Sequence, residues 1–287
     1  MKDEELPAEV SVVLIHLGDN LPEYFNICVR QIRHYFRGRI LACIPESAII
    51  EDKTVERISI QSLNQDRISQ FDKTFMAEEG PFWSYTFKRL FVLEEIMRTC
   101  NLTDVWHIEN DVLIYFDPAT YRNLNETEGV YINPVGPKYA TYACMHVCGL
   151  DGIDGMVQLN NWNLKILNEG KKVLAERYDE GGSVNEMLVA KELYDMGIAR
   201  GLPTLPDADT TVVFDGSAYG QYVGGTPFKP EPGWAEKERY VGEYFLDSRG
   251  KIIWIDGEPY VKDRDLFHIV KIMNLHIHSK QLEKYAW

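Results

Sequence analysis

The stretch VWHIENDVLIYFDP, residues 105–118, places three polar residues in the middle of an apolar run. Its β-branched and aromatic residues are typical of a strand in the core of a sheet. Glu109, Asn110 and Asp111 do not suit the interior of such a strand, because a buried charge needs a partner. We therefore expect the strand to end near Ile108, the polar residues to form a turn, and residues 112–115 to continue as a second short strand.

A helical pattern leads directly into this stretch. At residues 82–100 the apolar side chains of Trp83, Phe87, Leu90 and Met97 fall on one stripe. Alternating strands and helices predict an α/β fold with a mainly parallel twisted sheet flanked by helices. Further strands are predicted at 10–17, 39–44, 56–60 and 129–135, and further helices at 21–36, 155–167 and 185–196.

No linker or repeat divides the chain, so we expect one domain over residues 1–287. Residues 1–118 would form its nucleotide-binding half and residues 119–287 its acceptor-side half. The second half is expected to be largely irregular, because residues 201–260 are dominated by Gly, Pro and aromatic residues. A strand at 269–278, followed by a short helix, is expected to end it.

Composition narrows the possible partners. The net charge of −14 argues against a nucleic-acid-binding surface, which needs a basic excess. No apolar run approaches the roughly 18 residues of a membrane span, and the acidic N-terminus lacks the apolar core of a signal peptide. Five cysteines, an odd number, suggest reduced thiols and a cytoplasmic protein. Cys144, His146 and Cys148 lack the second ligand pair of a zinc site.

The acidic turn is a candidate metal site. Glu109 and Asp111 are two residues apart, so on an extended chain their carboxylates share one face, roughly 7 Å apart. They follow a central strand, and open α/β sheets bind ligands beyond the carboxyl ends of their strands. Oxygen ligands suit Mg²⁺ or Mn²⁺, which would be shared with substrate phosphates. The alternative is an exposed turn with solvated acids.

The last predicted strand carries a second polar face. In NLHIHSK, Asn274, His276 and His278 alternate with apolar residues that would pack on the core. Lys280 follows the strand and suits a diphosphate as a point charge. The alternative is an edge strand with surface histidines.

Together these features resemble the GT-A class of nucleotide-sugar glycosyltransferases. In that class a D-x-D motif holds a divalent cation on the donor diphosphate, and a late His often adds a ligand. Glu109-Asn110-Asp111 would be an E-x-D variant of the motif, with His276 or His278 as the added ligand. The segment FWSYTFKRLFVLEEI resembles the helix before that motif, whose basic residue faces the donor; this implies Arg89 or Lys88.

The order of elements also resembles the retaining, glycogenin-like branch of the class. LDGIDGMVQLNNWN and SVNEMLVAKEL occupy the places of its Gly-rich acceptor segment and its acid-amide motif. The C-terminal motif departs from the pattern: that branch places His and Lys six apart, whereas His276 is four residues from Lys280 and His278 is two. His276 lies closer to the pattern.

The resemblance implies a metal-dependent glycosyltransferase. It would use Mn²⁺ or Mg²⁺ and transfer a sugar from a nucleotide-sugar donor, a UDP- or GDP-sugar, to a glycan or lipid-linked acceptor. The donor would lie along His16, Gly18 and Asn110, near the ends of the first strands and the acidic turn. Arg89 or Lys88, together with Lys280, would meet its phosphates.

The residue that moves a proton is open at this stage. If the reaction inverts the sugar, a carboxylate must accept the proton of the acceptor hydroxyl, and Asp154, Glu186 and Asp215 are candidates. If it retains configuration, Asn185 and Glu186 could line the reacting face. A sugar-nucleotide pyrophosphorylase would need a Gly-rich basic loop that HLGDNLPEY lacks. An inactive module that binds glycans or proteins is the other alternative.

Overall fold

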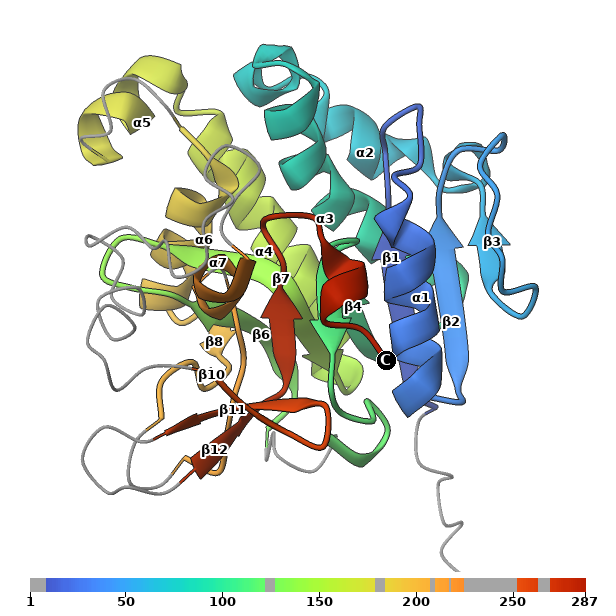
Figure 1. The fold of residues 1–287 in the computed structure, drawn as a ribbon. Coiled ribbons are helices and arrows are strands. Elements are labelled where there is room, and N and C mark those ends of the chain that lie inside the picture. Colours follow the sequence, from blue (N-terminus) through green and yellow to red (C-terminus); the bar gives the residue numbers. More distant parts are fainter. Residues whose placement is uncertain are drawn as a thin grey trace, which may run out of the picture.

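The central sheet consists of short strands that are mostly buried. In the computed structural model, which describes residues 9–121, 127–178, 184–206, 210–216, 218–224, 252–262 and 269–287, seven strands pair in the order β3-β2-β1-β4-β7-β6-β8 (Figure 1). They are β1 (Ser11–Ile15), β2 (Arg39–Cys43), β3 (Glu56–Ile58), β4 (Asp104–Ile108), β6 (Gly129–Pro134), β7 (Ala140–Cys148) and β8 (Arg200–Gly201). Within the described ranges of this sheet, β7 alone runs antiparallel to its neighbours. The mainly parallel α/β sheet is confirmed.

Helices cover both faces of this sheet. Alternation along β1 sends Val12 to a core shared with α1, and Val13 to a core shared with α3, α4 and α6. The helices are α1 (Tyr24–Tyr35), α2 (Gln65–Phe71), α3 (Pro81–Thr99), α4 (Leu150–Leu167), α5 (Lys171–Tyr178), α6 (Glu186–Asp195) and α7 (Tyr219–Gly224), with 3-10 turns η1 (Ile60–Ser62), η2 (Phe75–Glu78) and η4 (Leu282–Lys284).

Helix α3 agrees with its predicted range to within one residue at each end, and α6 does likewise. Helix α4 begins at Leu150, five residues before its predicted start. The prediction placed the start too late because Gly152 and Gly155, in the first two turns, normally disfavour helix. Close packing explains Gly155: a Cβ there would lie 3.0 Å from a methyl carbon of Val130 in β6. A glycine-rich stretch is therefore helical here because it lies against the sheet.

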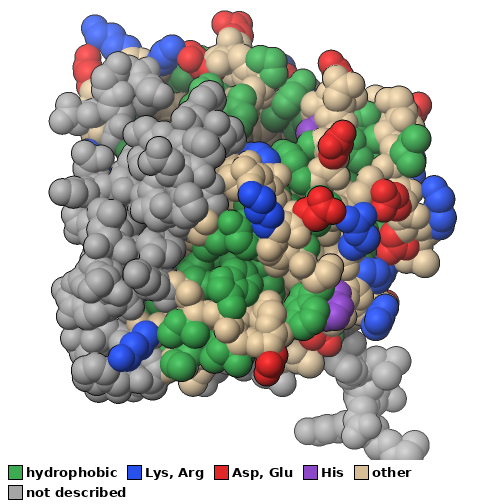
Figure 2. Space-filling model, viewed as in Figure 1, with side chains coloured by type: hydrophobic (Ala, Val, Ile, Leu, Met, Phe, Trp, Pro, Cys, Tyr) green, Lys and Arg blue, Asp and Glu red, His purple; other side chains and the backbone are tan. Residues whose placement is uncertain are grey.

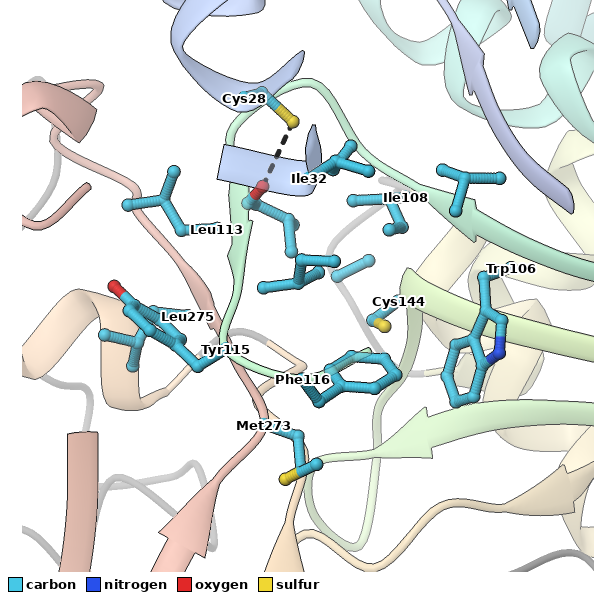
Figure 3. Packing of buried hydrophobic residues seen from close by; sticks show 14 of the residues in the cluster. Cys28, Ile32, Trp106, Ile108, Leu113, Tyr115, Phe116, Cys144, Met273 and Leu275 are labelled. Atoms are coloured by element: carbon cyan, nitrogen blue, oxygen red, sulfur yellow. Dashed lines mark hydrogen bonds between the residues drawn. The ribbon is translucent and has the colours of Figure 1, made fainter. Parts of the chain in front are cut away.

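A second short pairing lies beside α1. Strand β5 (Val112–Ile114) pairs antiparallel with β13 (Asn274–His276), so that Leu113 and Leu275 are directly opposite each other. Both leucines are fully buried in the cluster of Figure 3, which also contains Ile32 of α1. This core holds the last strand of the chain against the acidic turn.

The C-terminal stretch predicted as one strand is two strands in different sheets. Residues Ile269–Ile272 form β12, and the chain changes partners at Met273. The Met273 N–H donates to the carbonyl of Val213 (2.8 Å), while its own carbonyl accepts from the N–H of Tyr115 (2.8 Å). The single-strand prediction was wrong because alternation cannot reveal which strand each half pairs with.

Part of the region expected to be irregular is a sheet. Four strands pair in the order β10-β11-β12-β9, with β9 (Val212–Val213), β10 (Ile252–Ile255) and β11 (Glu258–Lys262). Asp256 and Gly257 connect β10 and β11, both with positive φ (50° and 80°). An Asp-Gly pair between apolar runs is a hairpin signal that the sequence carried and the prediction missed. Residues 225–251 lie outside the described residues.

The surface agrees with an acidic, mixed-charge chain. On the face in Figure 2, acidic and basic side chains are interspersed, and the described ones form no continuous basic area. Among the helices of the described residues, none combines the length and apolar character that crossing a bilayer requires.

The pairing of β5 with β13 can be tested by truncating its two leucines. Leu113→Ala and Leu275→Ala should each lower the free energy of unfolding by about 2–5 kcal/mol, because each leaves a cavity. The double variant should lose less than the sum, by about 0.5 kcal/mol or more, because directly opposite residues share packing. Urea unfolding measures all three, and Val173→Ala, at an exposed position of α5, is the control. Strict additivity would contradict the pairing.

Candidate metal centre

The acidic turn lies at the carboxyl edge of the sheet. Strands β1 and β4 are parallel neighbours, so their carboxyl ends meet there. The Glu109 N–H still donates to Ala143 of β7 (3.0 Å), and the Val112 N–H then donates to Glu109 (3.1 Å), which closes the turn. Beneath it, the Cys28 thiol of α1 donates to the carbonyl of Val112 (3.2 Å). The strand-turn-strand expected from the sequence is present.

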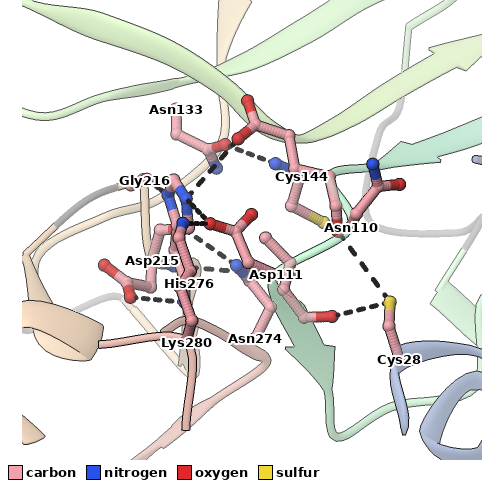
Figure 4. A network of polar contacts seen from close by, with 12 residues as sticks. Cys28, Asn110, Asp111, Asn133, Cys144, Asp215, Gly216, Asn274, His276 and Lys280 are labelled. Carbon is pink, nitrogen blue, oxygen red and sulfur yellow. Dashed lines mark hydrogen bonds and ion pairs between the residues drawn. The ribbon is translucent and has the colours of Figure 1, made fainter. Parts of the chain in front are cut away.

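Glu109, Asp111 and His276 converge on one point. One ligand atom from each residue lies within 4.8 Å of the others, the distance range of a shared cation. The Nε2 atom of His276 lies 3.2 Å from Oδ2 of Asp111 (Figure 4). The same atom lies 3.5 Å from Oε2 of Glu109. Two acids from mid-chain and an imidazole from the C-terminal strand therefore face one space.

The imidazole of His276 is oriented by the backbone. Its Nδ1 lies 2.7 Å from the carbonyl of Gly216, which can only accept, so Nδ1 carries the proton. Nε2 faces the carboxylates, and it would offer its lone pair to a metal after losing its own proton. Metal-binding histidines are typically held in this way. The donor set, two carboxylates and one oriented imidazole, fits a divalent cation.

Two basic side chains neutralise the acids. The Nη2 atom of Arg89, on α3, lies 2.5 Å from Oε1 of Glu109, and Lys280 forms an ion pair with Oδ2 of Asp111. Lys88 is directed elsewhere: its ammonium pairs with Asp72 beyond α2 (2.9 Å). Of the two basic residues proposed to face the donor, Arg89 is at the site and Lys88 is not.

These contacts set the charge of the cluster. Burial alone would raise the pKa of both acids, but Arg89 lowers the pKa of Glu109, and His276 with Lys280 hold the pKa of Asp111 well below its usual range. Burial by itself lowers the pKa of His276, but the two acids outweigh it and raise this pKa to about 9. Because the pKa values of both acids are lowered, both carboxylates are ionised at neutral pH.

His16 and Asn110 connect the turn to the end of β1. The side-chain amide of Asn110 donates to the carbonyl of Ile15 (3.2 Å) and to Nδ1 of His16 (3.2 Å). Nε2 of His16 in turn donates to the carbonyl of Asn20 (2.8 Å). A Cβ on Gly18 would lie 3.0 Å from that Nε2, so the loop passes close to the ring. All three proposed donor-binding residues lie at this edge, with the Asn110 amide nitrogen already engaged.

Asp215 holds the backbone of the segment that carries His276. It is fully buried, and its carboxylate accepts from the backbone N–H groups of Ala218, Tyr219, Gly220 and His276 at 2.7–2.9 Å. A carboxylate so enclosed does not reach an acceptor hydroxyl. Asp215 fixes the backbone of His276, and we expect it to support the site rather than act as a base.

Asn274 and Gly220 complete this support. The Asn274 amide exchanges two hydrogen bonds with the backbone of Asp215 (2.8 and 3.1 Å), and the side chain is fully buried rather than facing the site. A Cβ on Gly220 would lie 1.7 Å from the His276 carbonyl oxygen. The glycine therefore allows α7 to approach β13 closely. Sequence periodicity has no signal for these contacts, which join segments far apart in the chain.

The other two proposed bases lie in different environments. Glu186 begins α6, is largely buried, and accepts a hydrogen bond from the Thr86 hydroxyl (3.1 Å). Burial raises the pKa of Glu186; the charge of Arg89 lowers this pKa and that of Glu109 raises it. Asp154 is an exposed residue of α4, outside the hydrogen bonds and ion pairs described for the cluster. Asn185 caps α6 through its side-chain oxygen, which accepts from the backbone N–H groups of Met187 and Leu188.

His278 and Tyr24 flank the cluster. The ring of His278 lies 4.3 Å from that of His276, at a tilt of 55°, but His278 is not one of the three converging residues. The structure thus favours His276 over His278 as the metal ligand. Tyr24, the first residue of α1, was missed: its ring lies 5.9 Å from the Lys280 ammonium, and burial and Asp111 raise its pKa. Its position one loop after β1 was the available signal.

Among known proteins, matches to this chain are found in solved structures of low sequence identity. No family model matches the chain, and no curated protein sequence matches it. The structure is similar to mouse xyloside xylosyltransferase 1 in its apo form, at a TM-score of 0.45 and 10% identity, over 68% of this chain and 85% of that one. It is also similar to galactosyltransferase LgtC with donor and acceptor sugar analogs, at a TM-score of 0.39 and 12% identity, over 68% of this chain and 76% of that one. A third similar structure is glycosyltransferase GlyE of Streptococcus pneumoniae, at a TM-score of 0.33 and 15% identity, over 68% of this chain and 45% of that one.

A substitution of Asp215 separates support from catalysis. Asp215→Asn should lower the free energy of unfolding by about 1–3 kcal/mol, because the amide NH₂ would face buried backbone donors that the carboxylate now satisfies. Asp154→Asn, at an exposed position, should change it by no more than about 0.5 kcal/mol. Urea unfolding compares the two. Unchanged stability of Asp215→Asn, together with loss of turnover, would restore the role of base.

Proposed function

We propose that this protein is a metal-dependent glycosyltransferase, which moves a sugar from a nucleoside-diphosphate donor to a hydroxyl of a glycan or lipid-linked acceptor. The observation that carries the proposal is the convergence of Glu109, Asp111 and His276 at the carboxyl edge of β1 and β4. Residues 1–118 supply the acids and residues 119–287 the imidazole, so the site joins both proposed halves of the chain.

Glu109, Asp111 and His276 would hold Mn²⁺ or Mg²⁺. When bound, such a cation neutralises the charge that develops on a diphosphate leaving group. Arg89 keeps one oxygen of Glu109 engaged, so the other remains directed at His276. Gly216 keeps Nε2 of His276 directed at the same point. These residues orient the ligands before the donor arrives, which is how an enzyme stabilises developing charge efficiently.

Lys280 is the proposed partner of the diphosphate. Its ammonium contacts Asp111, and 38% of its side chain is exposed. A mobile point charge there can meet phosphate oxygens as the leaving group departs.

Glu186 is the remaining candidate for proton transfer or for stabilising the sugar. Among the three proposed carboxylates, it is the one acted on by the charges of Arg89 and Glu109. The raised pKa suits a group that exchanges a proton near neutral pH.

The metal centre can be tested by isosteric replacement. Asp111→Asn should weaken Mn²⁺ binding by about 100-fold, because a neutral amide replaces an ionised ligand while the shape is kept. Isothermal titration calorimetry measures the change. Asp72→Asn is the matched control, since it breaks a lysine–aspartate pair of the same chemistry at the surface. Equal loss in both variants, or none in Asp111→Asn, would contradict the assignment.

The donor can be identified by thermal shift. UDP-, GDP-, CMP- and dTDP-sugars are each added with and without Mn²⁺, because a ligand that binds only the folded state raises Tm. At 100 times Kd the stabilisation is about 2.7 kcal/mol, which corresponds to several degrees. We expect one nucleotide to give a rise that depends on Mn²⁺ and is lost in Asp111→Asn. No shift with any of them would leave a binding module as the better description.

A further inference from the structure

Lys280 and His276 share one oxygen of Asp111. The Lys280 ammonium forms an ion pair with Oδ2, and Nε2 of His276 lies 3.2 Å from the same atom. This oxygen faces His276, so a cation held jointly by Asp111 and His276 would use it. The ammonium therefore contacts an atom that the cation needs.

An ammonium and a divalent cation on that oxygen repel each other. Both carry positive charge, and the site is largely buried, since 10% of the Asp111 side chain is exposed. Charges repel more strongly there than in water. This repulsion favours movement of one of them when the other binds.

Of the three basic side chains described around the acids, Lys280 is the one able to move. Arg89 is 12% exposed and His276 13%, and His276 is fixed by Gly216 and Asp215, whereas the Lys280 side chain is 38% exposed. Lys280 ends a turn closed by its N–H and the Ile277 carbonyl (3.0 Å), and its backbone has a left-handed φ of 61°. The turn fixes the backbone, while the four-carbon stem can swing.

We propose that Lys280 has two positions: on Asp111 before the divalent cation binds, and on the donor diphosphate after the cation has displaced it. This inference rests on the proposed function. Displacement provides the diphosphate with a free ammonium only when the cation is present. Lys280 thereby links the order of binding, cation first and donor second.

The displacement can be followed by acylation of lysine amines in the full-length protein, read by mass spectrometry. Saturating Mn²⁺ alone should increase the labelling of Lys280 several-fold, because its ammonium leaves Asp111 for solvent. Lys88 is the internal control: it also pairs with an aspartate, Asp72, and its labelling should not change. Labelling of Lys280 that stays constant or falls when Mn²⁺ saturates would overturn the displacement.

Calorimetry separates this inference from the metal centre itself. Lys280→Met should bind Mn²⁺ about tenfold more tightly than the wild type, because no ammonium has to be displaced. Lys88→Met should bind like the wild type. Equal affinity of wild type and Lys280→Met would reject the displacement and leave the metal centre standing. Absence of Mn²⁺ binding to any of them would reject both.

Discussion

Two carboxylates enclosed at the end of one strand impose the constraint that the site has to meet. Glu109 and Asp111 lie close together in a largely buried space, and like charges about 4 Å apart in such surroundings repel by roughly 4 kcal/mol. Their ionisation is sustained by cations that three separate elements supply: Arg89 from α3, His276 from β13 and Lys280 from the turn that follows it. The acidic turn is therefore stable only in the complete fold.

Strand β13 is held in place by Asp215 and Asn274, whose side chains contribute no ligand atom to the site. The carboxylate of Asp215 accepts hydrogen bonds from four backbone N–H groups, one of them that of His276. The side-chain amide of Asn274, in β13, donates to the backbone carbonyl of Asp215. Burial of Leu113 against Leu275 adds the apolar part of this attachment. Precise placement of an imidazole over 160 residues away from its carboxylate partners is thus achieved by packing and by backbone hydrogen bonds together.

The same arrangement explains why the carboxylates in the sequence have unequal roles. Asp215 is completely enclosed by donors, Asp154 faces solvent, and Glu186 lies near the charged cluster in a buried position. All three are acids beside a predicted loop or helix end. Their surroundings, not their residue type, distinguish support, surface and candidate chemistry.

Local pattern was enough to predict the α/β class, the helices α3 and α6, and the turn formed by Glu109, Asn110 and Asp111, because burial and periodicity act over a few residues. The resemblance to the GT-A class, and not the local pattern, predicted that His276 or His278, together with Lys280, belongs with the acids. The change of partner at Met273, the hairpin at Asp256 and Gly257, and the enclosure of Asp215 were not predicted.

The amino-acid sequence by itself determined which chemical groups the chain can offer and that strand β4 ends at the acidic turn. The tertiary structure decided which of those groups meet: Arg89 rather than Lys88, and His276 rather than His278, converge on the acids. The physical reason is that each choice depends on contacts between distant segments: α3 turns Arg89 toward the acidic turn, and β13, held in register with β5, ends at His276, so that His278 lies beyond the strand. That register is set by contacts between segments far apart in the chain.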